Sequence, residues 1–274
     1  MRRGNSRKNT AKIQLQHIKR YIMIQETISS QEKCPILKGR LGVGVREAFS
    51  FFYPGYRTES DIFSECITRY LNRNSVVLDA GCGKGMFFRY PWKSQVQLLV
   101  GCDIEASVSC NPNIASGICA NLMRLPFVQD SFDIVFSHYV LEHLESPHTV
   151  FSEFCRVLKH GGKLIVLTPS KYHYVSTLSR MTPHLFHETI SRIRGNEEHD
   201  AFPTKYIANC KRELVRNAER AGLILREFIT KEASPNYLLW SLPSFLLGVA
   251  YERFVNSLAF MSPFRSSIIA IFEK

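Results

Sequence analysis

The chain has 274 residues, of which 45% are hydrophobic, and a formal net charge of +11 at pH 7. This length and apolar content suffice for one large domain or two small ones with an ordinary buried core. The basic charge is concentrated at the N-terminus, because residues 1–50 hold eleven Lys or Arg against three acidic residues. The rest of the chain carries only +3, which argues against a body built to bind a polyanion.

The N-terminal region is the most basic part of the chain. We expect residues 1–50 to form a basic arm, partly disordered or helical, in front of a domain over residues 51–274. Three interpretations of the arm stay open: a solvated tail, a contact to nucleic acid or an anionic membrane, and an organellar presequence without acidic residues. A secretory signal is not expected, since no continuous apolar core follows the basic start. We therefore expect a cytoplasmic protein, with an organelle as the alternative.

Cysteine spacing and apolar runs limit the chain further. The eight cysteines form no CxxC pair and show no metal-ligand spacing, so we expect reduced thiols and no metal site. No apolar run reaches the roughly 18 residues needed to span a bilayer. The nearest is Tyr237–Ala250, which Pro243 and Gly248 interrupt. Core, dimer face, lipophilic pocket and membrane-surface contact all stay open for this run.

From Val76 onward, strand-like and helix-like segments alternate. Apolar runs predict strands over 76–78, 97–102, 117–121, 132–137, 163–168, 223–230 and 267–273. Apolar spacing predicts a helix over 140–157, ended by the pair Gly161 and Gly162, and a basic helix over 207–221. This alternation predicts a mostly parallel sheet with helices on both faces. Two insertions, about 170–204 and 233–265, interrupt it, and such loops commonly build a substrate pocket.

The turn after the first strand is the most informative motif. A buried strand is followed by Asp79 and then by three glycines at alternate positions, Gly81, Gly83 and Gly85. Glycine permits positive φ and lets a ligand approach the backbone, and ligands bind at the carboxyl ends of parallel strands. The carboxylate of Asp79 would repel a pyrophosphate but would attract a ligand that carries an ammonium and a sulfonium.

Two later segments predict an adenosine site. Asp103 closes the second strand, where a carboxylate can accept hydrogen bonds from both ribose hydroxyls. The segment from Asn121 to Asp133 leads into the fourth strand and offers a polar side chain and backbone N–H groups to an adenine edge.

In these residues the chain resembles the class I S-adenosylmethionine-dependent methyltransferases, and especially the group that includes quinone-biosynthesis and small-molecule methyltransferases. Five segments carry the resemblance, in order: Val76–Gly85, Val100–Asp103, Leu125–Asp133, Val140–Leu144 and Arg156–Lys163. They cover about residues 75–170. The resemblance implies a Rossmann-like, seven-stranded α/β sheet. Its last strand, 267–273, would run antiparallel between strands five and six.

The resemblance also implies a binding site for S-adenosylmethionine. Asp79, Gly81, Cys82 and Gly83 would surround its methionine part. The other implied contacts are Asp103 at the ribose, Asn121 and Leu122 at the adenine, and Ser137 and His138 facing the methyl group. Ile104 is a further cofactor contact that we expect. An Asp is common at the position of Asn121, and a neutral acceptor makes a weaker hydrogen bond than a charged one.

Catalysis of methyl transfer depends chiefly on positioning the acceptor, and a hydroxyl or acidic carbon also needs a base. We expect His138 and His187 to be the catalytic residues. His143, His173 and His184 are further candidates, and a structural role is favoured for His143. Tyr139 could orient an acceptor. Segment 51–59 resembles a lid over the cofactor, which makes Tyr53, Tyr56 and Arg57 candidate contacts, with Tyr56 assigned to the cofactor.

The sequence thus predicts S-adenosylmethionine-dependent methyl transfer to a small, lipophilic acceptor at oxygen or carbon. Two alternatives stay open: an RNA or protein methyltransferase tethered by the basic arm, and a non-catalytic protein that binds S-adenosylmethionine. The nearly neutral body makes nucleic acid the weaker choice of partner.

Overall fold

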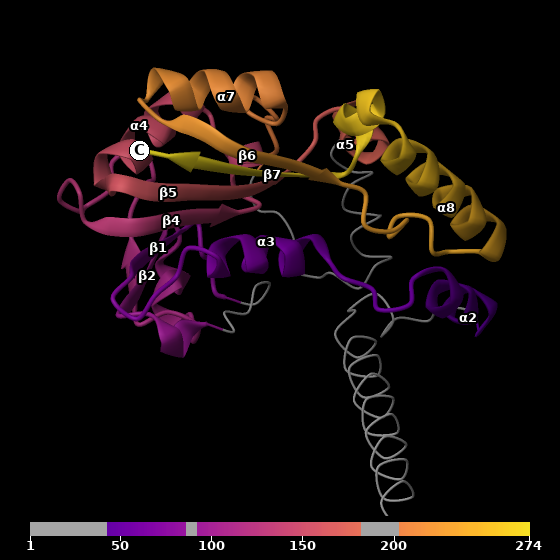
Figure 1. The fold of residues 1–274 in the computed structure, drawn as a ribbon, viewed down its shortest axis with the longest axis horizontal. Coiled ribbons are helices and arrows are strands. Elements are labelled where there is room, and N and C mark those ends of the chain that lie inside the picture. The colour runs from indigo at the N-terminus through magenta and orange to yellow at the C-terminus, as the bar shows by residue number, and fades with distance from the viewer. Residues whose placement is uncertain (1–42, 86–91, 182–202) are drawn as a thin grey trace, which may run out of the picture. The chain divides into compact units, whose positions relative to one another are not determined.

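A computed structural model describes residues 43–85, 92–181 and 203–274 (Figure 1). The chain divides into two compact units. The first comprises Met1–Arg57 with Ser234–Tyr251, and the second comprises Thr58–Ala233 with Glu252–Lys274. Each unit is built around hydrophobic clusters of its own.

The described strands are β1 (Val76–Ala80), β2 (Leu98–Asp103), β3 (Ser116–Cys119), β4 (Phe132–His138), β5 (Leu158–Pro169), β6 (Ile224–Lys231) and β7 (Ser267–Glu273). The described α-helices are α2 (Val43–Phe52), α3 (Glu59–Thr68), α4 (Pro147–Val157), α5 (Tyr174–Met181), α7 (Lys211–Arg220) and α8 (Leu242–Ser257). Short 3₁₀ helices are η2 (Lys93–Gln95), η3 (Ala106–Cys110), η4 (Leu141–His143) and η5 (Ala259–Phe264).

All seven strands form one sheet in the order β3-β2-β1-β4-β5-β7-β6. Strands β1 to β5 pair in parallel, whereas β7 lies antiparallel to both β5 and β6. This arrangement confirms the expected Rossmann-like fold and the place of the last strand. The strand order reverses at β1, which lies between β2 and β4, and such a switch point opens a ligand crevice at the carboxyl ends of the strands.

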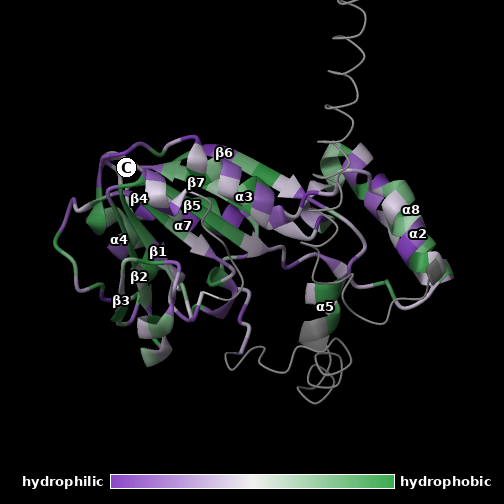
Figure 2. Cartoon of the chain, turned by 90° about the horizontal axis from the view of Figure 1, so that it is seen from below, coloured by the Kyte–Doolittle hydropathy of each residue, from purple (hydrophilic) through white to green (hydrophobic). Residues whose placement is uncertain are grey.

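The central strands carry apolar residues on both of their faces because both faces are covered. In β7, Ile268 and Phe272 belong to one hydrophobic cluster, and Ile269 and Ile271 belong to the other. In Figure 2 the central strands are coloured mostly as hydrophobic. A run of four such residues therefore predicts a buried strand better than strict alternation would.

Helices cover both faces of the sheet. Helices α4 and α7 lie on one face, and α3 lies on the other (Figure 1). Helix α3 begins at Glu59 because Thr58 and Asp61 form a capping box, in which each side chain accepts a hydrogen bond from the other's backbone N–H. This cap fixes the start of α3, which places Glu59 and Ser60 near the carboxyl edge of the sheet.

The predicted helix over 140–157 is wrong in its first part. The chain forms the 3₁₀ turn η4 after β4, and α4 begins only at Pro147. Proline cannot donate a backbone hydrogen bond, so it fits the first turn of a helix and not its interior.

The pair Gly161 and Gly162 does not end a helix, which corrects the expectation for this pair. Both residues lie inside β5, where Phe132 pairs with Leu158 but Ile134 pairs with Lys163. Gly161 has φ +78°, and this positive φ accompanies the register shift. The basic helix predicted over 207–221 is shorter than expected, because α7 starts at Lys211. Of the first predicted insertion, residues 182–202 lie outside the described part.

The described part of the first unit packs α2 against the start of α8. Its core consists of Val45, Phe49, Leu239, Phe245 and Val249. A Cβ at Gly248 would lie 2.3 Å from the Cβ of Pro235, so glycine permits this close approach. Among the described residues, no helix is both long and apolar enough to cross a membrane.

We predict that Phe154→Ala lowers the free energy of unfolding by about 3–5 kcal/mol, because it leaves a cavity in the fully buried cluster beneath α4. Urea denaturation followed by circular dichroism measures this change. Phe260→Ala is the matched control, since Phe260 is 73% exposed and its loss should cost little. Equal losses of the free energy of unfolding in the two variants would contradict the burial of Phe154 in the core.

Candidate functional site

The glycine turn after β1 has the backbone that the sequence predicts. Gly81, Gly83 and Gly85 have φ values of +86°, +47° and +74°. A Cβ at Gly81 would lie 2.3 Å from a methyl group of Val140, and one at Gly85 would lie 2.0 Å from the Oδ1 of Asn111. A Cβ at Gly83 would meet nothing within 4 Å. The turn is therefore enclosed at both ends and open in its middle, which fits a ligand against the backbone of Gly83.

The end of β2 holds this turn in place. The N–H of Gly81 donates to the carbonyl of Cys102 at 2.7 Å, and the N–H of Gly83 donates to the Oδ2 of Asp103 at 2.8 Å. The other oxygen of Asp103 accepts from the N–H of Glu105 at 3.0 Å. The structure thus brings Asp103 to the glycine turn, although the two are far apart in the sequence. Its expected contact with a ribose stays a prediction.

A second support comes from the segment after β2. The side-chain amide of Asn111 donates to the carbonyls of Cys82 and Gly83, both at 3.2 Å. The amide of Asn113 donates to the carbonyl of Gly85 at 2.6 Å. The two asparagines hold the carbonyl side of the turn. No periodicity or motif in the sequence points to them, because their role appears only when β2 packs beside β1.

Acidic and thiol groups surround the turn. Asp79 is 2% exposed at the end of β1. Burial, together with the charges of Asp79 and Asp103, raises the pKa of the Cys82 thiol. Burial and the Asp103 charge likewise raise the pKa of Cys102 to about 12. Both thiols are therefore neutral at pH 7, so the charge beside the turn is that of the two carboxylates.

The expected adenine segment makes a tight turn of its own. The side-chain Oδ1 of Asn121 accepts the N–H of Met123 at 2.9 Å, and its carbonyl accepts the N–H of Arg124. Leu122 is 8% exposed, whereas Ile104, after β2, is 56% exposed. The structure orders the backbone at Asn121 and Leu122, and their contacts with an adenine stay a prediction.

An ion pair on α4 secures the same segment. The Arg156 guanidinium binds both carboxylate oxygens of Glu153, at 2.7 and 2.8 Å, and donates to the carbonyls of Leu125 and Phe127. The N–H of Leu125 donates to Glu153 at 2.7 Å. The bond from Arg156 holds the pKa of Glu153 below its usual range. The sequence does not reveal the role of this pair, because Glu153 and Arg156 have the helical spacing of an ordinary surface ion pair.

Ser137, His138 and Tyr139 follow one another at the end of β4. Ser137 is fully buried, and its hydroxyl donates to the carbonyl of Ala80 at 2.9 Å. The Nε2 of His138 lies 2.9 Å from the hydroxyl oxygen of Ser60 on α3. Tyr139 has φ +56°, which is uncommon for a bulky residue and often marks a functional position.

The surroundings of His138 are apolar and aromatic. Its ring centroid lies 5.6 Å from that of Phe63 and 4.8 Å from that of Tyr139. Burial lowers the pKa of His138 to about 4. The imidazole is therefore neutral at pH 7, and it can take part in hydrogen bonds beside a cationic ligand without repelling it.

Another candidate base, His173, belongs to a buried acidic cluster. Its Nε2 lies 3.4 Å from the Oε2 of Glu232, and each of these side chains is at most 3% exposed. Glu232 also accepts the N–H of Ser266 at 2.7 Å. Burial and the charge of Glu232 raise the pKa of Glu59, to which Ser266 is hydrogen-bonded. This cluster joins α3, β6 and β7 at the same edge of the sheet as His138.

The remaining candidates divide between the two units. Tyr56 belongs to the first unit, where its hydroxyl accepts hydrogen bonds from Ser234 at 3.0 Å and Asn236 at 3.3 Å. The Nδ1 of His143 lies 3.4 Å from the carbonyl of Pro203. His184 and His187 lie outside the described residues. In the described part of the chain, no group of three or more His, Cys, Asp or Glu side chains could hold a metal ion.

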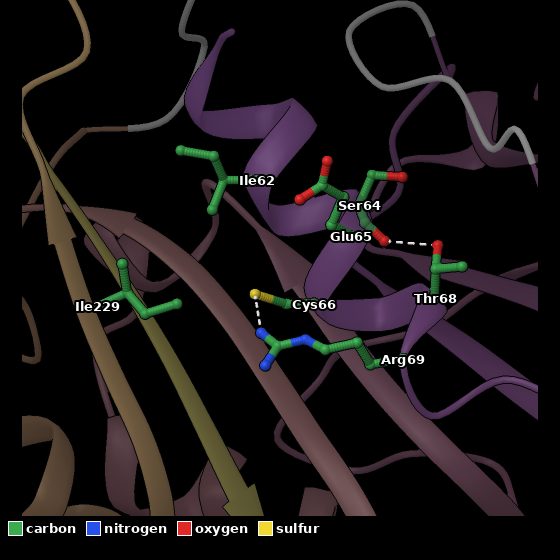
Figure 3. Close-up of a pocket in the computed structure, with 7 residues that line it drawn as sticks. All are labelled: Ile62, Ser64, Glu65, Cys66, Thr68, Arg69 and Ile229. Carbon is green, nitrogen blue, oxygen red and sulfur yellow. Dashed lines mark hydrogen bonds between the residues drawn. The ribbon is translucent and has the colours of Figure 1, made fainter.

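A pocket of about 660 Å³ lies elsewhere, between α3 and β6 (Figure 3). The lining residues are Ile62, Ser64, Glu65, Cys66, Thr68, Arg69 and Ile229. Arg69 donates to the sulfur of Cys66 at 2.8 Å and to Glu227. In strand order β6 is four places from β1, so this pocket is not part of the glycine turn.

We predict that Gly81→Ala lowers the free energy of unfolding by about 2–4 kcal/mol, through its positive φ and the clash with Val140. Gly161→Ala is the matched control, because Gly161 has φ +78° but nothing within 4 Å of an added Cβ. It should cost only about 1 kcal/mol from backbone strain. Chemical denaturation of both variants measures the difference. If Gly81→Ala is as stable as Gly161→Ala, the prediction is wrong, because the turn or the side chain of Val140 must then shift enough to relieve the clash.

We predict that His138 makes the protein sensitive to acid. Its folded pKa of about 4 lies below the ordinary value of 6.5, so the unfolded chain binds this proton first. Stability is therefore lost as the pH falls from about 6.5 to about 4, by up to about 3 kcal/mol. His138→Gln should remove this slope, whereas His148→Gln, at an exposed position, should not. Thermal unfolding between pH 4 and pH 7.5 measures it, and unchanged slopes in both variants would refute the role of His138.

Comparison with known proteins agrees with this geometry. Residues 78–166 match the family described as the methyltransferase domain. The chain is 34% identical over 117 residues to malonyl-[acyl-carrier protein] O-methyltransferase of Herminiimonas arsenicoxydans, covering 39% of this chain and 44% of that protein. It is 31% identical over 119 residues to tRNA (carboxymethyluridine(34)-5-O)-methyltransferase of Arabidopsis thaliana, covering 41% of this chain and 29% of that protein. The chain spans about half the length of the first curated relatives that it matches.

A solved structure supports the fold. The S-adenosylmethionine-dependent methyltransferase of Mesorhizobium loti superposes with a TM-score of 0.50 at 15% identity, over 79% of this chain and 98% of that one. The glycine turn, the carboxylate at the end of β2 and the open position at Gly83 suit S-adenosylmethionine as the cofactor. The matched residues include the turn, β4 and most of β5. Residues 78–166 are therefore similar to the methyltransferase domain family, and the fold is that of the S-adenosylmethionine-dependent methyltransferase from Mesorhizobium loti.

Proposed function

We propose that this protein transfers the methyl group of S-adenosylmethionine to oxygen or carbon of a small, lipophilic acceptor. The observation that carries the proposal is the neutral His138, enclosed by Phe63 and Tyr139 at the carboxyl end of β4. An aromatic environment without net charge suits an apolar acceptor that presents a hydroxyl or an acidic carbon. The cofactor supplies an electrophilic methyl group, and the residues of the chain position the acceptor toward it.

The acidic groups at this edge of the sheet support a small acceptor over nucleic acid. Asp79 and Asp103 lie at the ends of β1 and β2, while Glu59 and Glu232 gather near the ends of β6 and β7. The carboxylates of Asp79 and Asp103 would repel a phosphate backbone, which binds chiefly to Lys and Arg. Burial raises the pKa of Glu59 and so favours its neutral form. An RNA acceptor held by the basic arm is the alternative that the experiment tests.

In the proposed reaction, His138 and Ser60 hold the acceptor in place. The 2.9 Å contact between them fixes the orientation of the imidazole ring. With a pKa of about 4, His138 is a weak base, so its main contribution is positioning rather than proton removal. His187 keeps its proposed role as base.

We predict that S-adenosylhomocysteine raises the melting temperature and that NAD does not. At 100 times its dissociation constant, the ligand should add about 2.7 kcal/mol to the free energy of unfolding. Asp103→Ala should remove most of this effect, and Asp130→Ala, which changes an exposed acid elsewhere, should retain it. Stabilisation by NAD alone would contradict the assignment of the site.

The acceptor class is tested with S-adenosylmethionine that carries a labelled methyl group. The purified protein is incubated with lipid extract, with transfer RNA or with protein, and label is counted in each fraction. We expect label in the lipid-soluble fraction. Label in RNA or protein alone would replace the proposed acceptor, and tight cofactor binding without any transfer would favour a non-catalytic role.

A further inference from the structure

The exposed side of α8 is apolar where a surface helix is normally polar. Leu242, Leu246 and Leu247 are 41%, 43% and 69% exposed, and Ala250 is exposed as well. At about 100° per residue, these four residues lie within one arc of about 140°. A surface helix usually carries charged and polar residues on that side. We call this arc, together with the preceding Trp240, the α8 apolar face.

The apolar side chains of this face are not needed for the core of the first unit. Phe245 and Val249 lie on the opposite side of α8 and pack with Val45, Phe49 and Leu239. Trp240 is 78% exposed, just before the helix begins. From Leu242 to Tyr251 the helix is thus apolar on both sides, and a charge enters the outer side only at Arg253, which is 61% exposed. A helix that is apolar on both sides usually packs against another apolar surface on its outer side as well.

The sequence around the face excludes charge. No Lys, Arg, Asp or Glu occurs between Ala233 and Tyr251. Tyr237, which is 40% exposed, and Trp240 stand at the beginning of this run. Aromatic side chains with one polar group prefer the boundary between lipid and water. Helix α8 has only 16 residues, so it would lie along a membrane surface rather than across it.

The charge of the N-terminal residues indicates which kind of surface the α8 apolar face would bind. The segment that precedes α2 in the sequence, residues 1–42, contains ten Lys or Arg and two Glu. Such a segment is attracted to anionic headgroups, by about one kT or more per cation near the surface. Two copies of the chain would instead bring two segments of like charge together. Charge complementarity therefore favours an anionic lipid surface over a second copy.

We propose that the α8 apolar face inserts into the interface of an anionic phospholipid membrane. This inference deepens the proposed function, because it names the surface from which a lipophilic acceptor would be taken. It rests on the proposed function only for that purpose. Lipid binding can be measured without any acceptor and without turnover.

The experiment uses the full chain with vesicles of phosphatidylcholine, with or without phosphatidylserine. The chain has two tryptophans, Trp92 and Trp240, which are 1% and 78% exposed. We expect a blue shift of the tryptophan emission on vesicles that contain phosphatidylserine. Trp240→Phe should abolish the shift, because Trp92 is already buried. A shift that persists in Trp240→Phe would overturn the proposal.

A charge placed on the face gives the second measurement. Leu247→Glu should weaken co-sedimentation with the anionic vesicles by about tenfold or more, since an ionised side chain must leave the interface. Val128→Glu is the matched control, because Val128 is 77% exposed on the segment before β4. It should bind vesicles like the unaltered protein. Equal binding by Leu247→Glu and Val128→Glu would overturn the proposal.

Two further readouts keep the outcomes distinct. Stabilisation by S-adenosylhomocysteine should be the same in Leu247→Glu and the unaltered protein, which shows that the variant folds. Light scattering without lipid tests whether a second copy of the chain binds the α8 apolar face instead. A dimer that Leu247→Glu dissociates, without any vesicle binding by the unaltered protein, would assign the face to a second copy and overturn lipid binding. Failure of S-adenosylhomocysteine to bind either protein would contradict the proposed function but not this inference.

Discussion

The hydrogen bond between the N–H of Gly83 and the carboxylate of Asp103, 2.8 Å long, is the interaction on which the rest of the site depends. It joins the turn after β1 to the end of β2 and so places a negative charge beside an open stretch of backbone. The bond can form because β1 and β2 are parallel neighbours, which brings their carboxyl ends together. The strand order also reverses at β1, which lies between β2 and β4. A switch point of this kind leaves a crevice that helices cannot cover. The cofactor site thus follows from the topology of the sheet.

The site is held by residues that have no chemical role of their own. Asn111 and Asn113 bind the carbonyls of the turn, and the pair of Glu153 and Arg156 binds the segment opposite. These bonds keep backbone groups in fixed positions before a ligand binds. Less conformational entropy is therefore lost on binding. The protein uses amide and guanidinium groups for this purpose because each can bind two carbonyls at once. The methyl transfer that we propose would benefit directly, since its rate depends on fixed relative positions of two reactants.

The acceptor side differs from the cofactor side in its chemistry. Asp79 and Asp103 place two carboxylates at the glycine turn, whereas His138 is neutral among aromatic rings. The same burial that lowers the pKa of His138 keeps it from repelling a cationic cofactor. Farther along the edge, the cluster of Glu59, Glu232 and His173 again concentrates titratable groups. The α8 apolar face belongs to a separate unit and has a different partner in our proposal, a lipid surface.

The sequence by itself determined the strands of the sheet, the glycine turn and the acids Asp79 and Asp103, because these depend on local patterns. Runs of apolar residues indicate strands that are buried on both faces, and glycines at alternate positions indicate a turn with positive φ. The tertiary structure alone decided where α4 begins, how Gly161 and Gly162 sit inside β5, and which side chains hold the turn. It also decided that Ser60 meets His138 and that the outer side of α8 is exposed. These features depend on contacts between residues far apart in the chain, and no local pattern encodes such contacts.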